Sequence, residues 1–131
     1  MIDLYLNKKK CEPCTGKTEK FTKIKIEKFL KQINTWSIND KQEMIFKKFK
    51  FKNFKSKIEF VNRIANISEE EGHHPDISFG WGYCLIMLHT HAIKGLSIND
   101  FIFSLSGPFF LISSLNKSPV DTCFKSKLLI I

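Results

Sequence analysis

The sequence predicts an α+β domain in which helices pack on one face of an antiparallel sheet. Segments with a helical apolar period are interspersed with strand-like segments, in the order helix, strand, helix, strand, strand, helix. The length of 131 residues suits a single domain with one hydrophobic core. Thirteen phenylalanines and an apolar fraction of 43% favour a packed globule over a disordered chain.

Residues 1–20 are polar and show no sustained period, so they are expected to form an irregular arm. Apolar side chains then recur at helical spacing, at Ile26, Phe29, Leu30 and Ile33. Thr22 precedes them as a candidate N-cap. The segment from Trp36 to Ile38 could add a short strand after this helix.

The stretch "EMIFKKFKF" from Glu43 to Phe51 alternates imperfectly between apolar and polar residues, which predicts a half-buried strand. A longer helix is expected from about Phe54 to Glu71, with Asn53 as its cap and one apolar stripe. The acidic run 69–71 lies at its C-terminus, where the helix dipole disfavours negative charge. At least one of these carboxylates is therefore expected to have a specific role.

Two further strands are expected at Ile77–Trp81 and Tyr83–Thr90, joined by a tight glycine-containing turn. The last helix opens with the capping-box pattern of Ser97 and Asp100. Gly107-Pro108 is expected to end that helix, because proline cannot continue the hydrogen-bond ladder.

The net charge of +8 is concentrated in residues 1–57, where sixteen lysines face six acidic residues. This basic half is a candidate surface for nucleic acid or an acidic partner. The lysines alternate with apolar residues, however, and neither an arginine-rich run nor a nucleic-acid motif accompanies them. We therefore favour the solvated faces of amphipathic elements and do not expect nucleic-acid binding.

Nothing in the sequence predicts export or membrane insertion. The N-terminus lacks the apolar stretch of a signal peptide, and the uncharged segment Phe101–Leu115 is shorter than the about 20 residues that span a bilayer. A cytoplasmic location is expected, with the cysteines at 11, 14, 84 and 123 as free thiols. Cys11-x2-Cys14 is half of a zinc ribbon, but no second pair follows, so it is interpreted as structural or incidental.

All four histidines of the chain lie within nineteen residues, at His73, His74, His89 and His91. Histidine is the residue type whose charge changes near neutral pH, so such a cluster indicates proton transfer or metal binding. A metal shell could be completed by Glu69 or Asp76. Adjacent histidines usually diverge in an extended chain, however, which makes 73 and 74 a poor chelating pair.

The spacing of this segment is specific. It reads Glu69, three residues, His73-His74-Pro75, five residues, Trp81, nine residues, His91, eight residues and Asp100. This pattern resembles the signature of the pterin-4a-carbinolamine dehydratases. The similarity extends to Trp36, to "FKKFKFKNF" and to "THAIKGLSIND", and so covers roughly residues 24–105. The arm segment "KKCEPCTG" is also similar to that of some bacterial members.

The resemblance implies a four-stranded antiparallel sheet with helices on one face, in a dehydratase-like domain at residues 21–106. It implies loss of water from a 4a-hydroxytetrahydropterin to give a quinonoid dihydropterin, without metal or cofactor. It further implies a homo-oligomer, dimer or tetramer, and a pathway link to aromatic amino acid hydroxylases. The apolar stretch 107–131 departs from the family, whose members usually end soon after the last helix.

Positions matched to the family carry expected roles. His73 and His91 are the expected acid/base catalysts, and His74 is expected chiefly to bind substrate. The candidate substrate contacts are Glu69, Pro75, Thr90 and Trp36. Taken on its own, Trp36 is more simply a core residue and Glu69 a solvated one.

The chemistry suits imidazole. A hydroxyl leaves a saturated ring carbon more easily when an acid protonates it, while a base removes a ring N–H proton. Some members of the family also act as dimerisation cofactors of a homeodomain transcription factor. A binding module of that kind and a histidine-rich metal-binding protein are therefore the alternatives to an enzyme.

Overall fold

A computed structural model describes residues 6–106, so Cys123 and the apolar stretch 107–131 lie outside the described residues. The elements are η1 (Leu6–Lys8), α1 (Lys23–Leu30), β1 (Ser37–Ile38), β2 (Ile45–Phe49), α2 (Phe54–Glu71), β3 (Asp76–Gly80), β4 (Tyr83–Leu88), η2 (His91–Ile93) and α3 (Ile98–Ser104). Between residues 6 and 106, no helix combines the length and apolar character that crossing a membrane requires.

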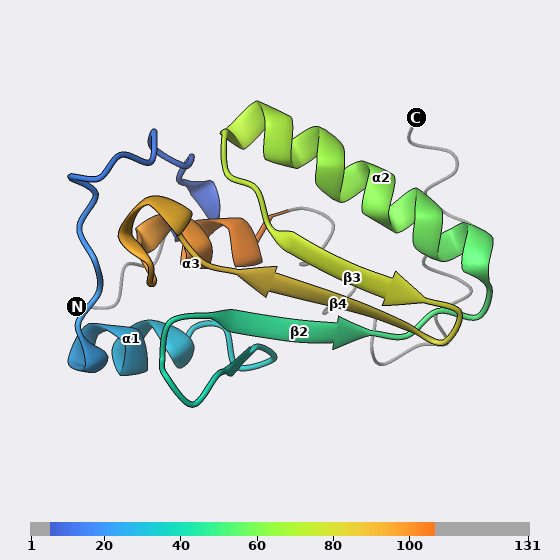
Figure 1. Cartoon of the computed structure of the whole chain (residues 1–131), viewed down its shortest axis with the longest axis horizontal. Helices are drawn as coiled ribbons and strands as arrows, with labels where there is room; N and C mark the ends of the chain where they lie inside the picture. Colours follow the sequence, from blue (N-terminus) through green and yellow to red (C-terminus); the bar gives the residue numbers. More distant parts are fainter. Residues whose placement is uncertain (1–5, 107–131) are drawn as a thin grey trace.

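The four strands form one antiparallel sheet in the order β1-β2-β4-β3, which confirms the predicted α+β class. Figure 1 shows β4 between β2 and β3. The short strand at residues 37–38 pairs with the start of β2 at the sheet edge. β3 and β4 form a hairpin in which Gly80 pairs with Tyr83, so two residues make the turn. Antiparallel pairing then places the start of β3 beside the end of β4.

One hydrophobic core joins the helices to the sheet. β4 buries alternate residues, Cys84, Ile86 and Leu88, as its sequence predicts. From the helical side, Phe60 of α2 packs its ring 4.9 Å from that of Phe49 in β2. Phe101 of α3 stacks on Phe21 at 5.5 Å, which joins the last helix to the segment before α1.

β4 ends at Leu88, two residues before the predicted end at Thr90. The reason is tertiary. The Thr90 N–H donates to the Gly95 carbonyl at 2.8 Å, and Thr90 then leads into η2. α1 likewise ends at Leu30, but turn-like hydrogen bonds continue from it and keep Ile33 buried.

α2 has the predicted bounds. Its cap is Asn53, whose side chain accepts from the Ser56 N–H at 2.8 Å, and Gly72 ends it in the left-handed region at φ 63°. An unexpected feature is Lys57, which is fully buried. Its Nζ donates to the carbonyls of Gly80 and Trp81 and so holds the β3–β4 turn against the helix.

The described cysteines, Cys11, Cys14 and Cys84, are free thiols, as predicted. Burial raises the pKa of Cys84 to about 11, although the nearby Lys57 opposes the shift. A thiol with a raised pKa holds little thiolate at neutral pH, so Cys84 is a packing residue and not a nucleophile.

Replacing Phe60 by alanine is expected to lower the free energy of unfolding by about 3–5 kcal/mol, because the fully buried ring packs between Phe49 and Phe51. Phe54 of the same helix is 46% exposed, so Phe54→Ala is the matched control, with an expected loss of about 1 kcal/mol or less. Urea unfolding followed by circular dichroism measures both. Equal losses would contradict the position of the core.

Candidate histidine site

The hairpin brings all four histidines to one end of the sheet. His73 and His74 precede β3, whereas His89 and His91 follow β4, and Asp76 pairs with Met87 across the two strands. Each imidazole contacts a carboxylate. The contacts are His73 with Asp100, His74 with Glu69, and both His89 and His91 with Asp76. The histidines therefore share one region but divide among three acidic partners.

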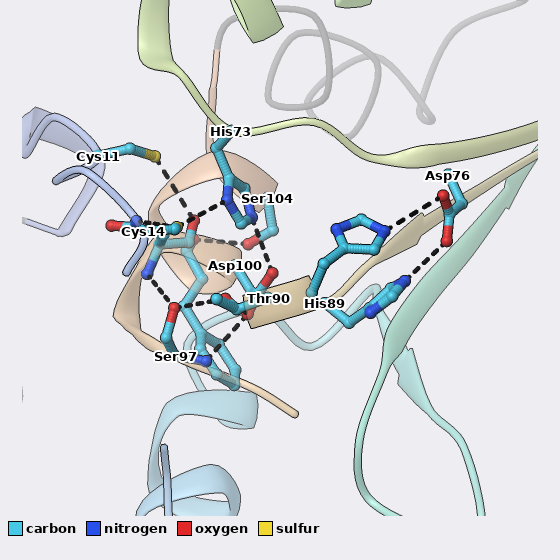
Figure 2. A network of polar contacts seen from close by, with 12 residues as sticks. Cys11, Cys14, His73, Asp76, His89, Thr90, Ser97, Asp100 and Ser104 are labelled. Carbon is cyan, nitrogen blue, oxygen red and sulfur yellow. Dashed lines mark hydrogen bonds and ion pairs between the residues drawn. The ribbon is translucent and has the colours of Figure 1, made fainter. Parts of the chain in front are cut away.

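Asp100 is the buried centre of this region (Figure 2). One carboxylate oxygen accepts from His73 Nε2 at 2.8 Å. The other accepts from Thr90 Oγ1 at 2.8 Å and from the Ser97 N–H at 2.9 Å. Since an ionised carboxylate can only accept, the contact with His73 assigns the ring hydrogen to Nε2. The capping box of α3 therefore also orients an imidazole.

His73 is enclosed on its other side as well. Its Nδ1 lies 3.6 Å from the Sγ of Cys14, and its ring meets Phe103 edge-on at 5.7 Å. The residue is only 4% exposed. Both ring nitrogens thus face protein groups, one a carboxylate and the other a thiol.

The irregular arm supplies that thiol because it is docked on α3. Asn99 exchanges two hydrogen bonds with the Glu12 backbone, of 3.0 and 2.6 Å, and donates to Cys14 Sγ at 3.0 Å. The Cys11 N–H donates to Glu71 at 2.8 Å. Burial, followed by the charge of Glu71, raises the pKa of Cys11 to about 12. Two of the acidic residues that end α2 therefore make specific contacts, Glu71 with the arm and Glu69 with His74.

His74 is held loosely. Its side chain is 58% exposed, and Nε2 lies 2.8 Å from a Glu69 oxygen that is itself on an exposed side chain. Even a fully charged surface pair contributes only about 0–1 kcal/mol. The ring is therefore free to exchange this partner for a solute.

Asp76 lies between the two remaining imidazoles. One carboxylate oxygen is 2.7 Å from His89 Nε2, and the other is 3.6 Å from His91 Nε2. The two rings lie with centroids 4.0 Å apart. The hydrogen bond with His89 is the largest influence on Asp76 and holds the pKa of this carboxyl below its usual range. The His91 side chain is 58% exposed, which leaves it accessible.

The other predicted site residues lie deeper. Trp36 is buried beside Phe49, with ring centroids 6.4 Å apart, so the interpretation as a core residue is confirmed. Thr90 is 1% exposed, with its hydroxyl and N–H both engaged inside the protein. Pro75 is half-buried in the loop before β3.

Two residues of this site, Cys14 and Asp100, were not among the predicted site residues, and Asp100 was expected chiefly as a helix cap. A signal for Asp100 was present, because it ends the signature in which the histidines lie. No sequence signal pointed to Cys14, because its contact is with His73, 59 positions away in the sequence. A groove between the arm and α3 is lined by Glu12, Pro13, Thr15, Lys17, Thr18, Glu19, Phe21, Lys25, Ile98 and Asn99, and thus by none of the histidines.

Comparisons with known proteins agree on one family. The profile described as pterin 4 alpha carbinolamine dehydratase matches residues 19–105. A Halorhodospira halophila protein provisionally named pterin-4-alpha-carbinolamine dehydratase is 41% identical over 101 residues, 77% of this chain and 93% of its own length. A Rickettsia bellii protein with the same provisional name is 42% identical over 104 residues, which are 79% of this chain and 91% of its own length.

The fold recurs in a solved structure. The crystal structure of a transcriptional coactivator/pterin dehydratase from Brucella melitensis superposes with a TM-score of 0.61. The superposition covers 68% of this chain and 100% of the Brucella chain, and the two sequences are 24% identical.

Asp100→Asn is expected to lower the free energy of unfolding by about 1–3 kcal/mol, because an amide must present a donor to either His73 or the Ser97 N–H. Asp76→Asn is the matched control, since this carboxylate also contacts histidine but is 50% exposed, and a loss below about 1 kcal/mol is expected. Urea unfolding at pH 7 measures both. A loss no larger for position 100 than for position 76 would contradict the central role of Asp100.

Proposed function

This chain belongs to the pterin 4 alpha carbinolamine dehydratase family, and we propose that it eliminates water from a 4a-hydroxytetrahydropterin to give a quinonoid dihydropterin. The observation that carries the proposal is the placement of His74 and His91, two exposed imidazoles at the same end of the hairpin, each beside a carboxylate. They occupy positions at which the family signature has histidine.

The reaction needs one proton donor and one proton acceptor. The bond between C4a and its hydroxyl breaks as the acid protonates the oxygen, and water leaves. The base removes a ring N–H proton, and the electron pair left behind forms the new double bond. The overall change is loss of water without oxidation or reduction, so acid/base residues suffice.

His91 fits one of these two roles. Its ring is accessible, and Asp76 lies 3.6 Å from Nε2, where a carboxylate can orient an imidazole and stabilise its protonated form. Proton transfer by a positioned side chain typically contributes about 10²- to 10⁴-fold. His74, exposed beside Glu69, is assigned to substrate binding.

His73 is proposed as the partner of His91 in acid/base catalysis, and its surroundings define how it can act. Asp100 holds Nε2, so His73 can exchange a proton with a substrate through Nδ1. Cys14 faces that nitrogen at 3.6 Å. In the substrate complex we therefore expect the arm to withdraw Cys14 from His73.

The remaining candidate contacts differ in accessibility. Glu69 is the most exposed and can accept from the donors on the edge of a pterin ring. Pro75 restrains the backbone of the loop that carries the two adjacent histidines. Trp36 and Thr90 are buried, so a direct contact from either would require local rearrangement.

Several expectations about context belong to the same proposal. They are assembly as a dimer or tetramer, a cytoplasmic location and a link to aromatic amino acid hydroxylases. The rival role, a dimerisation cofactor for a transcription factor, needs no turnover. An activity assay therefore separates the two roles.

Turnover of a 4a-hydroxytetrahydropterin is expected to fall about 10²- to 10⁴-fold in His91→Ala, because the exposed imidazole is lost without a cavity in the core. His74→Ala should mainly raise KM. His73→Ala should also lower kcat, measured after circular dichroism confirms folding. The control is His89→Ala, whose turnover should stay close to that of the wild type.

A wild-type protein that dehydrates the substrate no faster than buffer would exclude the enzyme and favour the binding module. Equal rates in the wild type and His91→Ala would exclude the assigned mechanism.

A further inference from the structure

We propose that Asp76, His89 and His91 form a binding site for a divalent transition metal of the zinc class. Each residue offers one ligand atom, and these atoms lie within 4.8 Å of one another. Two imidazoles and one carboxylate are a donor set that suits zinc, cobalt, nickel and copper, whereas magnesium and calcium prefer oxygen alone. His89 has no place in the proposed dehydration, so the site gives a use to an otherwise unassigned histidine.

The fold creates this convergence. Asp76 opens β3 and pairs with Met87, so its side chain lies beside the end of β4. His89 follows β4 directly, and His91 begins η2 two residues later. Figure 2 shows Asp76, at the start of β3, and His89, just after β4, pointing toward one another. All three ligands thus come from a short region of backbone held by the hairpin.

Metal binding would draw the three ligand atoms closer together than they lie in this structure. Zinc bonds of about 2.0–2.2 Å in tetrahedral geometry place ligand atoms about 3.4 Å apart. The three ligand atoms, one from each residue, lie within 4.8 Å of one another, and the two oxygens of Asp76 lie 2.7 Å from His89 Nε2 and 3.6 Å from His91 Nε2. The side chains of Asp76, His89 and His91 are 50%, 19% and 58% exposed, so a cation can reach the group from solvent. Three protein ligands would leave a fourth position for water.

The rival thiol site is less well arranged. Cys14 Sγ lies 3.6 Å from His73, but Cys11 Sγ is turned toward the Asn99 carbonyl at 3.7 Å. Zinc binds thiolates, and the buried Cys11 favours the protonated thiol. Within residues 6–106, therefore, the carboxylate–histidine group is the better candidate.

Occupancy would have a consequence for the reaction, and this part rests on the proposed function. A metal on His91 Nε2 would take the place of the Asp76 contact and leave the ring unable to take up a proton. The metal is therefore expected to inhibit dehydration reversibly, with His89 conferring the sensitivity. The same residue would be a catalyst when the site is empty and a ligand when it is filled.

The site is tested directly by titrating untagged, metal-free protein with zinc chloride in a calorimeter, and with cobalt(II) while following its visible absorption. One equivalent per chain is expected. Loss of a ligand in His89→Ala should weaken binding by roughly 100-fold or more, since even a lost outer partner costs about 10–100-fold. His74→Ala is the matched control, an exposed histidine beside a carboxylate outside the group, and should bind as the wild type does.

Three results would overturn the site: no binding by the wild type, unchanged binding by His89→Ala, or binding lost in a Cys11→Ser, Cys14→Ser double variant. The inhibition is tested separately, because zinc should slow turnover of the wild type but require at least about tenfold more metal in His89→Ala. Chelation by EDTA should restore the rate. A wild type without turnover would contradict the proposed function and the inhibition, while calorimetry would still decide the binding site.

Discussion

The buried carboxylate of Asp100 joins three segments of the chain. It accepts from His73 in the loop before β3, from Thr90 after β4 and from the Ser97 N–H at the start of α3. A buried carboxylate is stable only with such partners, because desolvation would otherwise favour its neutral form. The start of α3, the end of the hairpin and the orientation of one imidazole are therefore set by the same group.

The histidines around Asp100 differ in their exposure to solvent. His73 is enclosed by Asp100 and Cys14, whereas His74 and His91 are exposed beside carboxylates. An enclosed ring has a fixed orientation but is hard for a substrate to reach. An exposed ring is easy to reach but is less firmly oriented. An elimination that needs an acid and a base can use both properties, with one ring prepositioned and another open to the substrate. The same openness makes His91 available to a metal ion through Asp76 and His89.

Local patterns were sufficient for much of the fold. The 3.6-residue period and Asn53 predicted α2 with its observed bounds, the capping box placed the start of α3, and alternation showed which side of β4 is buried. Contacts between distant residues were not predictable in this way. The burial of Lys57 depends on carbonyls 23 and 24 positions away, and the contact of Cys14 with His73 depends on docking of the arm. The pairing of the four imidazoles with three carboxylates is likewise a tertiary property.

The central claim is that the fold anchored by Asp100 presents His74 and His91 to one pterin ligand. It is tested most directly by nuclear magnetic resonance of protein labelled with ¹⁵N in its histidine rings, titrated with an unreactive oxidised pterin. The ring resonances of His74 and His91 are predicted to shift together, along one saturable binding curve. A titration in which saturating pterin leaves both unchanged, or in which they follow different curves, would contradict the claim.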